Sequence, residues 1–186
     1  MAVLNHQSSI LVGEKVLLRS ISLADCTECY LSWLQDPEVN KYLETRWHHQ
    51  SLKTIRTFVS EMIESEDSYL FAIVEKGTNC HVGNLKIGPI DPYHNNADIS
   101  YFIGEKKRWG MGYATEAIKM GTEFGFTQLK LHRLQAGVYA SNIGSKKALE
   151  KIGYRYEGSF QEALRGNHGW EDHLKFGLLK RIWKSA

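Results

Sequence analysis

The chain has 186 residues, 42% of them hydrophobic and 24% charged, which are ordinary values for one globular domain over residues 1–186 with a sizeable core. Its net charge of +2 comes without a dense basic stripe, so we expect no nucleic-acid partner. No apolar run reaches the length of a membrane span and residues 1–9 lack the apolar core of a signal peptide, so we expect a cytoplasmic protein without a membrane partner.

Hydrophobic periodicity predicts helices and strands in alternation, without linkers or repeats. In chain order the expected elements are a strand (15–21), a helix (25–34), a helix from Asp36 to about Leu43, a helix (51–65), two strands (69–75 and 81–87), a strand (97–103), a long helix (114–126), a strand (131–139), a helix (144–151) and two strands (154–161 and 170–180). Asp36 and Ser51 are favourable helix caps, and Pro37 suits a first helical position. Early hairpin strands followed by a strand–helix–strand crossover indicate a mixed sheet in an α/β protein.

The three cysteines form an odd and sparse set, which fits a reducing compartment. Cys26 and Cys29 make a Cys-x-x-Cys pair inside the first expected helix, and no second pair follows. Two positions on one helix face explain this spacing better than a metal or redox site does. We therefore expect no metal centre.

A glycine-bearing loop joins the strand at 97–103 to the long helix. Its sequence is Arg108-Trp109-Gly110-Met111-Gly112-Tyr113-Ala114-Thr115. Glycines let an anion approach the main chain, where the first amides of a helix and its dipole can hold the charge. The Gly-Lys-Ser/Thr ending of a P-loop is missing, and Thr115 stands where a dinucleotide fingerprint has a third Gly or Ala. The loop predicts a pyrophosphate seat; alternatively, it only turns the chain.

A second segment follows the strand at 131–139. It begins Asn142-Ile143-Gly144-Ser145 and continues through Leu149, Lys151 and Gly153-Tyr154. Together with the run Lys107-Arg108-Trp109-Gly110-Met111-Gly112, it resembles the two signatures of the GNAT acetyltransferase superfamily. The sequence is most similar to the Rim-type ribosomal-protein N-terminal acetyltransferases and their relatives, from about Val16 to its end.

The resemblance implies the GNAT fold, in which helices flank a mixed central sheet with a splayed strand pair. It also implies an N-acetyltransferase that moves an acetyl group from acetyl-coenzyme A to a primary amine by direct attack in a ternary complex. In the family, amides of the glycine loop hold the pyrophosphate, and the splayed strand and an asparagine bind the pantetheine arm. The matching residues are Tyr101, Phe102, Ile103, Arg108, Trp109, Gly110, Met111, Gly112, Tyr113, Ala114, Thr115 and Asn142.

Two of these positions carry a further expectation. A main-chain amide near Ile103 could face the developing oxyanion, and such donors typically lower the barrier by about 3 kcal/mol. Asn142 is alternatively a turn or cap residue.

The general acid is not fixed by the resemblance. Many GNAT enzymes have a tyrosine where Leu149 stands here. Rim-type members offer a serine instead, which corresponds to Ser145. Ser145 is therefore a candidate coenzyme contact and acid, and its alternative role is to cap or solvate the short helix.

The general base is also open. The Rim-type glutamate would fall near Leu164, which cannot accept a proton. Glu162 points the same way if strand alternation holds, and the other candidates are Asp98 and Glu44. Each is alternatively a solvated carboxylate, and a water chain can also deprotonate an amine.

The segment expected to receive the acceptor is basic. Arg46, Lys53 and Arg56 follow one another with no acid between them. This excess argues against a polyamine and favours an acceptor with a phosphate or carboxylate, for which Trp47 offers a flat face. Glu44, Arg46 and Trp47 are thus the substrate-binding candidates, and a protein N-terminus or a nucleotide-linked amino sugar would fit. The alternative is a solvated basic helix with one buried tryptophan.

Other classes of protein stay open. The leucines at positions 149 and 164 are compatible with a non-catalytic acyl-coenzyme A sensor. A polyamine or antibiotic acetyltransferase would share the same coenzyme site. The glycine loop, Asn142 and Ser145 occur as a set, which favours an enzyme, and we expect a monomer or a homodimer.

Overall fold

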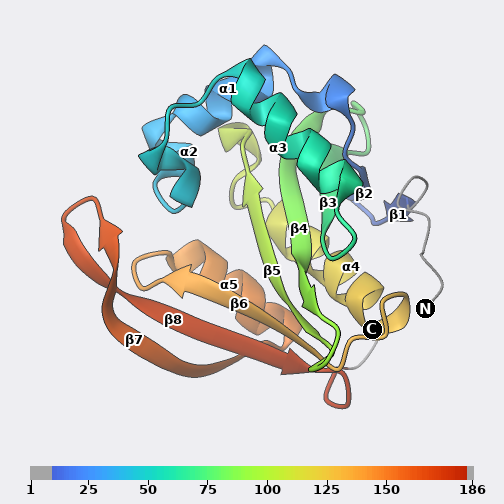
Figure 1. Ribbon diagram of the computed structural model, residues 1–186, viewed down its shortest axis with the longest axis vertical. Helices are drawn as coiled ribbons and strands as arrows, with labels where there is room; N and C mark the ends of the chain where they lie inside the picture. Colours follow the sequence, from blue (N-terminus) through green and yellow to red (C-terminus); the bar gives the residue numbers. More distant parts are fainter. Residues whose placement is uncertain (1–9, 184–186) are drawn as a thin grey trace.

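The computed structural model describes residues 10–183, which form one eight-stranded sheet with helices on both faces (Figure 1). The strands are β1 (Ile10–Val12), β2 (Val16–Ser20), β3 (Tyr69–Glu75), β4 (His81–Asp91), β5 (Asn96–Ile103), β6 (Arg133–Tyr139), β7 (Arg155–Gly166) and β8 (Gly169–Leu179). Their spatial order is β1-β2-β3-β4-β5-β6-β8-β7. The β5–β6 pair is parallel, and the other neighbouring pairs are antiparallel. The predicted mixed sheet is confirmed.

The helices divide into two groups that bury separate cores. They are α1 (Glu28–Gln35), α2 (Pro37–Asn40), α3 (Leu52–Glu64), α4 (Tyr113–Thr127) and α5 (Ile143–Ile152), with short 3-10 turns η1 (Leu23–Asp25), η2 (Glu44–Trp47) and η3 (Lys106–Arg108). The first three helices cover one face with Trp33, Ile55 and Val59 buried, whereas α4 buries Ile118 and Phe126 against the other face (Figure 1). No helix within residues 10–183 is long and apolar enough to cross a membrane.

Local capping explains where several helices begin. The Asp36 carboxylate accepts the Glu38 N–H at 2.8 Å, and Pro37 opens α2. The Ser51 hydroxyl accepts the Thr54 N–H at 3.2 Å at the start of α3. These side chains satisfy amides that have no partner inside a helix, so the predicted cap residues are confirmed.

The first predicted helix, 25–34, is wrong at its start. Asp25 turns inward and pairs with Arg19, whose Nη1 lies 2.8 Å from Oδ2, and this ends η1. Helix α1 begins after Thr27, whose hydroxyl caps the Tyr30 N–H. As a result, Cys26 is buried before the helix and Cys29 is exposed on it, so the two cysteines do not share one helix face.

The parallel strands β5 and β6 separate partway along their length. They pair only at Asn96–Arg133, Ala97–Leu134 and Asp98–Gln135. Beyond Asp98, β5 continues to Ile103 and β6 to Tyr139 while their ends diverge (Figure 1). This separation frees main-chain groups on the facing edges of both strands for other partners. The predicted splayed pair is confirmed, and the site lies where the strands part.

Candidate active site

The glycine loop turns back so that α4 starts with open amides. Gly110 has φ +74° and Gly112 has φ +85°, both in the left-handed region that favours glycine. Gly112 is the N-cap of α4 and gives no side-chain cap. The N–H groups of Tyr113, Ala114 and Thr115 therefore have no partner inside the helix and carry its positive dipole end.

These amides border a cavity of about 700 Å³, which we call the coenzyme cavity. The residues from the sequence prediction that line it are Tyr101, Phe102, Ile103, Arg108, Trp109, Gly110, Gly112, Tyr113, Ala114, Thr115, Asn142 and Ser145. Met111 is exposed and does not line it; its carbonyl accepts a hydrogen bond from Lys15 Nζ at 2.8 Å. The lysines that line the coenzyme cavity are Lys41, Lys147 and Lys151.

Glu75 anchors the glycine loop through hydrogen bonds. It accepts hydrogen bonds from Thr78 Oγ1 at 2.7 Å, Tyr113 Oη at 2.6 Å and Arg108 Nη2 at 2.8 Å. These three donors lower the pKa of Glu75 to about 2. Trp109 adds a second anchor, because its indole N–H donates to the Ile103 carbonyl at 2.8 Å. The loop is thus held in place before any ligand binds.

One polar atom of this anchor has no partner. Arg108 Nε is buried and makes no hydrogen bond with the described residues, although Arg108 lines the coenzyme cavity. A buried donor without an acceptor is unfavourable, and an anionic oxygen in the cavity would satisfy it. The unpaired Nε, the open amides and the lysines form a donor set that fits a pyrophosphate.

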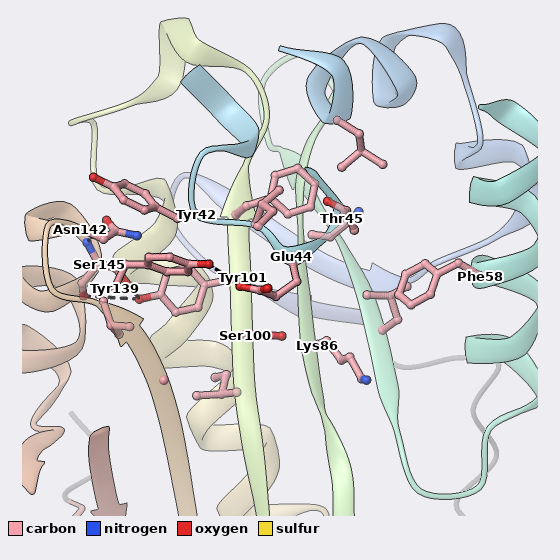
Figure 2. A pocket seen from close by; sticks show the side chains of 18 of the residues that line it. Tyr42, Glu44, Thr45, Phe58, Lys86, Ser100, Tyr101, Tyr139, Asn142 and Ser145 are labelled. Atoms are coloured by element: carbon pink, nitrogen blue, oxygen red, sulfur yellow. Dashed lines mark hydrogen bonds between the residues drawn. The ribbon is translucent and has the colours of Figure 1, made fainter. Parts of the chain in front are cut away.

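On the other side of the splay lies a second cavity of about 650 Å³, which we call the acceptor cavity (Figure 2). Its walls come from α1, η2, α3, α5, the strands β3 to β6 and the β7–β8 hairpin. Six residues line both cavities: Tyr42, Leu43, Tyr101, Phe102, Asn142 and Ser145. The two cavities therefore meet at this group.

At the meeting point, Tyr101 and Ser145 are joined by a short hydrogen bond. Tyr101 Oη lies 2.6 Å from Ser145 Oγ, and burial raises the pKa of Tyr101 to about 12 (Figure 2). The side chain of Asn142 caps α5 by accepting the Ser145 N–H at 3.1 Å. Leu149 is fully buried in the core, so the tyrosine beside Ser145 comes from β5 instead of α5.

Glu44 is the carboxylate of the acceptor cavity. Tyr139 Oη donates to Glu44 Oε1 at 2.5 Å (Figure 2). The Trp47 indole N–H donates to Oε2 at 3.2 Å. Burial, and then the contact with Glu44, raises the pKa of Tyr139 to about 12. The Glu44 carboxylate is thus held by two donors in a fixed position that faces Tyr139.

The structure does not bring Arg46 and Trp47 to the cavity wall. Arg46 donates to the carbonyls of Lys41 and Arg165 and, at 3.1 Å, to Asn167 Oδ1. Its guanidinium also lies 4.4 Å from the centre of the Trp47 ring. Its terminal nitrogens thus have partners within the protein, although its Nε has none among the described residues. These contacts argue against Arg46 as an anchor for an anionic acceptor. Arg46 connects η2 to the β7–β8 hairpin, and Trp47 is exposed beside Glu44.

The alternation argument for Glu162 is wrong because β7 bulges there. Pairing with β8 jumps from Phe160–His173 to Leu164–Glu171, so residues 161–163 lie opposite Asp172 alone. Glu162 has φ +48°, is exposed and lines neither cavity, whereas Leu164 lines the acceptor cavity. Asp98, at the last paired position of β5, is also exposed and lines neither cavity.

Sequence reasoning missed several residues that line the acceptor cavity, among them Tyr42, Lys86, Tyr139 and His173. Burial and the neighbouring Lys175 lower the pKa of His173. None of these residues belongs to a local motif.

The sequence matches the acetyltransferase (GNAT) domain family over residues 15–155. It is 30% identical over 173 residues, 92% of this chain and 96% of that protein, to the uncharacterized N-acetyltransferase p20 of Bacillus licheniformis. It is also 34% identical over 124 residues, 66% of this chain and 68% of that protein, to the probable N-acetyltransferase YjcK of Bacillus subtilis.

Solved structures agree with this match. An acetyltransferase of the GNAT family from Bacillus anthracis has a TM-score of 0.80 at 26% identity, covering 93% of this chain and 99% of that one. RimJ of Mycobacterium smegmatis, solved in complex with CoA-disulfide, has a TM-score of 0.78 at 25% identity, covering 91% and 85%. The chain belongs to the GNAT acetyltransferases, and Rim-type enzymes are among its structural neighbours.

Proposed function

We propose that this acetyltransferase moves an acetyl group from acetyl-coenzyme A to a primary amine by direct attack in a ternary complex. The observation that carries the proposal is the meeting of the coenzyme and acceptor cavities at Tyr101 and Ser145. Two cavities with shared lining residues allow both substrates to bind at once with their reacting atoms adjacent. We place this reaction in a single domain in the cytoplasm.

The residues that would hold the coenzyme are those of the glycine loop and the splay. Amides at the start of α4 and the unpaired Arg108 Nε would donate hydrogen bonds to the pyrophosphate, and Lys147 and Lys151 line the same cavity. The free edge of β5 at Tyr101 to Ile103 would bind the pantetheine arm, and Asn142 borders its path. Acetyl-coenzyme A supplies an activated thioester.

Ser145 would donate the proton that the leaving thiolate takes up. The amine nitrogen forms a bond to the acetyl carbon, the carbon–sulfur bond breaks, and the sulfur needs a proton. Ser145 and Tyr101 both line the two cavities, and their hydroxyl oxygens lie 2.6 Å apart, so Tyr101 would replace that proton. Solvent would then reprotonate Tyr101 and take up the proton that the acceptor amine releases. Because the pKa of Tyr101 is about 12, its hydroxyl is protonated in neutral solution.

Glu44 would receive or orient the proton of the acceptor amine. Of the base candidates from the sequence, Glu44 lines the acceptor cavity, while Glu162 and Asp98 do not. Its two hydrogen bonds, from Tyr139 and Trp47, hold the carboxylate in one orientation. An ammonium beside a fixed carboxylate is positioned before it loses its proton.

The acceptor would be a monoamine. A protein N-terminus and a small molecule both present one primary amine. A polyamine needs several acids, and Glu44 is the single acid among the described residues that line the cavity.

Thiol release from acetyl-coenzyme A tests the proposal, with amino acids, peptides, amino sugars and spermidine as acceptors. We expect thiol release that depends on a primary monoamine. Double-reciprocal plots of the initial rate should give intersecting lines, because both substrates must be bound before the reaction. A parallel-line pattern with an acetylated protein intermediate would contradict direct attack.

A further inference from the structure

The acceptor cavity carries two fixed charges of opposite sign. Among the described residues that line it, Glu44 is the single acid and Lys86 the single lysine or arginine. Lys86 lies on β4 directly opposite Ser100 of β5. Glu44 and Lys86 lie on either side of Ser100 in the view of Figure 2. The cavity therefore offers a negative charge at Glu44, which Tyr139 holds, and a positive charge at Lys86 on β4.

Lys86 has no ionic partner of its own. It is half-buried, and within residues 10–183 it makes no hydrogen bond or salt bridge. The acid whose charge reaches it is Asp67, an exposed residue already bonded to two serines. A half-buried ammonium without a paired anion is unfavourable, and a bound carboxylate would give it a charge-assisted hydrogen bond.

Much of the rest of the wall is apolar, although Thr45, Gln50, Thr54 and Asn84 also line the cavity. The apolar part is formed by Tyr30, Leu34, Ile55, Phe58, Leu70 and Phe102. An aliphatic or aromatic substituent would bury its surface here, whereas a second ammonium would find no acid. The wall thus favours one apolar side chain on the acceptor.

We infer that the acceptor is an apolar amino acid with a free carboxylate. Its ammonium lies at Glu44 beside Tyr101 and Ser145, its carboxylate pairs with Lys86, and its side chain lies on the apolar wall. The inference rests on the proposed function and narrows its acceptor, since a peptide N-terminus has an amide in place of the carboxylate that Lys86 would bind.

The experiment compares matched acceptors at saturating acetyl-coenzyme A. Phenylalanine, leucine and methionine are each assayed beside the amino acid amide, the decarboxylated amine and a tripeptide that begins with the same residue, and spermidine is added. The variants are Lys86→Gln and the control Lys53→Gln, an exposed lysine of α3 outside the cavity. Thermal melting verifies that both variants fold.

We expect the highest kcat/KM for a free apolar amino acid. Lys86→Gln should raise KM for that amino acid about tenfold, and change KM for its amide and decarboxylated amine less than about twofold. Lys53→Gln should change neither. A preference for tripeptides or spermidine, or an equal KM change for the acid and the amine in Lys86→Gln, overturns this inference and leaves the acetyltransfer itself intact. No thiol release with any acceptor, from protein that binds coenzyme A, overturns the proposed function and the inference with it.

Discussion

Replacing Ser145 by alanine tests the proton path most directly. In the wild-type protein, Ser145 and Tyr101 both line the two cavities, and their hydroxyl oxygens lie 2.6 Å apart. Ser145→Ala removes the hydroxyl that we propose as the donor to the thiolate. We expect kcat to fall about 100-fold, which corresponds to about 2.7 kcal/mol of barrier.

Coenzyme affinity should respond far less. The pyrophosphate donors lie at the glycine loop, and Ser145 contributes at most one neutral hydrogen bond of about 1 kcal/mol to the arm. The dissociation constant of coenzyme A, measured by calorimetry, should therefore rise no more than about fivefold. Ser159→Ala, at an exposed position of β7 outside both cavities, is the matched control and should change neither quantity.

A double variant decides whether Ser145 and Tyr101 act as one unit. Tyr101→Phe removes the hydroxyl behind Ser145 and leaves the ring in place. If the two hydroxyls form a single proton path, the double variant should be about as slow as the slower single variant. The assignment is refuted if the kcat losses of the two single variants multiply in the double variant. It is also refuted if kcat is unchanged in Ser145→Ala, or if Ser145→Ala loses kcat and coenzyme affinity equally.

Three other changes give separate tests. Gly112→Asp should abolish coenzyme A binding in calorimetry, because it places a carboxylate at the anion seat and a Cβ at φ +85°, whereas Gly77→Asp, in open space on the β3–β4 hairpin, should bind normally. Glu75 has a folded-state pKa of about 2, below its ordinary 4.5, so it stabilises the fold above pH 4.5 and loses that effect as the pH falls through about 2. Melting temperatures of Glu75→Gln should accordingly be lower at neutral pH and flatter across that window; a parallel curve would contradict the anchor. Arg46→Ala should lower the melting temperature by the same amount at high and low salt, because Arg46 is bonded to protein carbonyls. The control Arg56→Ala, at an exposed position, should not lower the melting temperature in this way. A strong salt dependence in Arg46→Ala would restore the idea of an exposed anion site.

The elements that were predictable from sequence are those with local causes. The glycine loop is predictable because glycine adopts the left-handed backbone conformation at positions 110 and 112 without strain. The starts of α2 and α3 follow from Asp36-Pro37 and Ser51, since a cap and its helix are neighbours in the chain. The splayed strands came from the family resemblance, because pairing between β5 and β6 depends on residues far apart in sequence.

The errors have non-local causes. Arg46 looked free because its partners, Arg165 and Asn167, lie on a hairpin near the other end of the chain. Glu162 looked suitably placed because the bulge in β7 has no clear signature in single-sequence alternation. In the same way, the Tyr101–Ser145 bond joins β5 to α5, and neither segment alone indicates it.

Leu149 and Leu164 stand where related enzymes have a catalytic tyrosine and glutamate, and the two leucines have different roles in the folded protein. Leu149 is buried in the core and contributes packing, while Leu164 forms part of the apolar acceptor wall. A hydroxyl nevertheless reaches the junction of the cavities from Tyr101 on β5, and a carboxylate reaches the acceptor cavity from Glu44 on η2. Proton transfer depends on where the acidic and basic atoms lie and not on which element supplies them. We infer that this chain carries out acyl transfer with groups from β5 and η2, in place of the residues at positions 149 and 164. We also infer that Leu164 then leaves an apolar surface facing the acceptor.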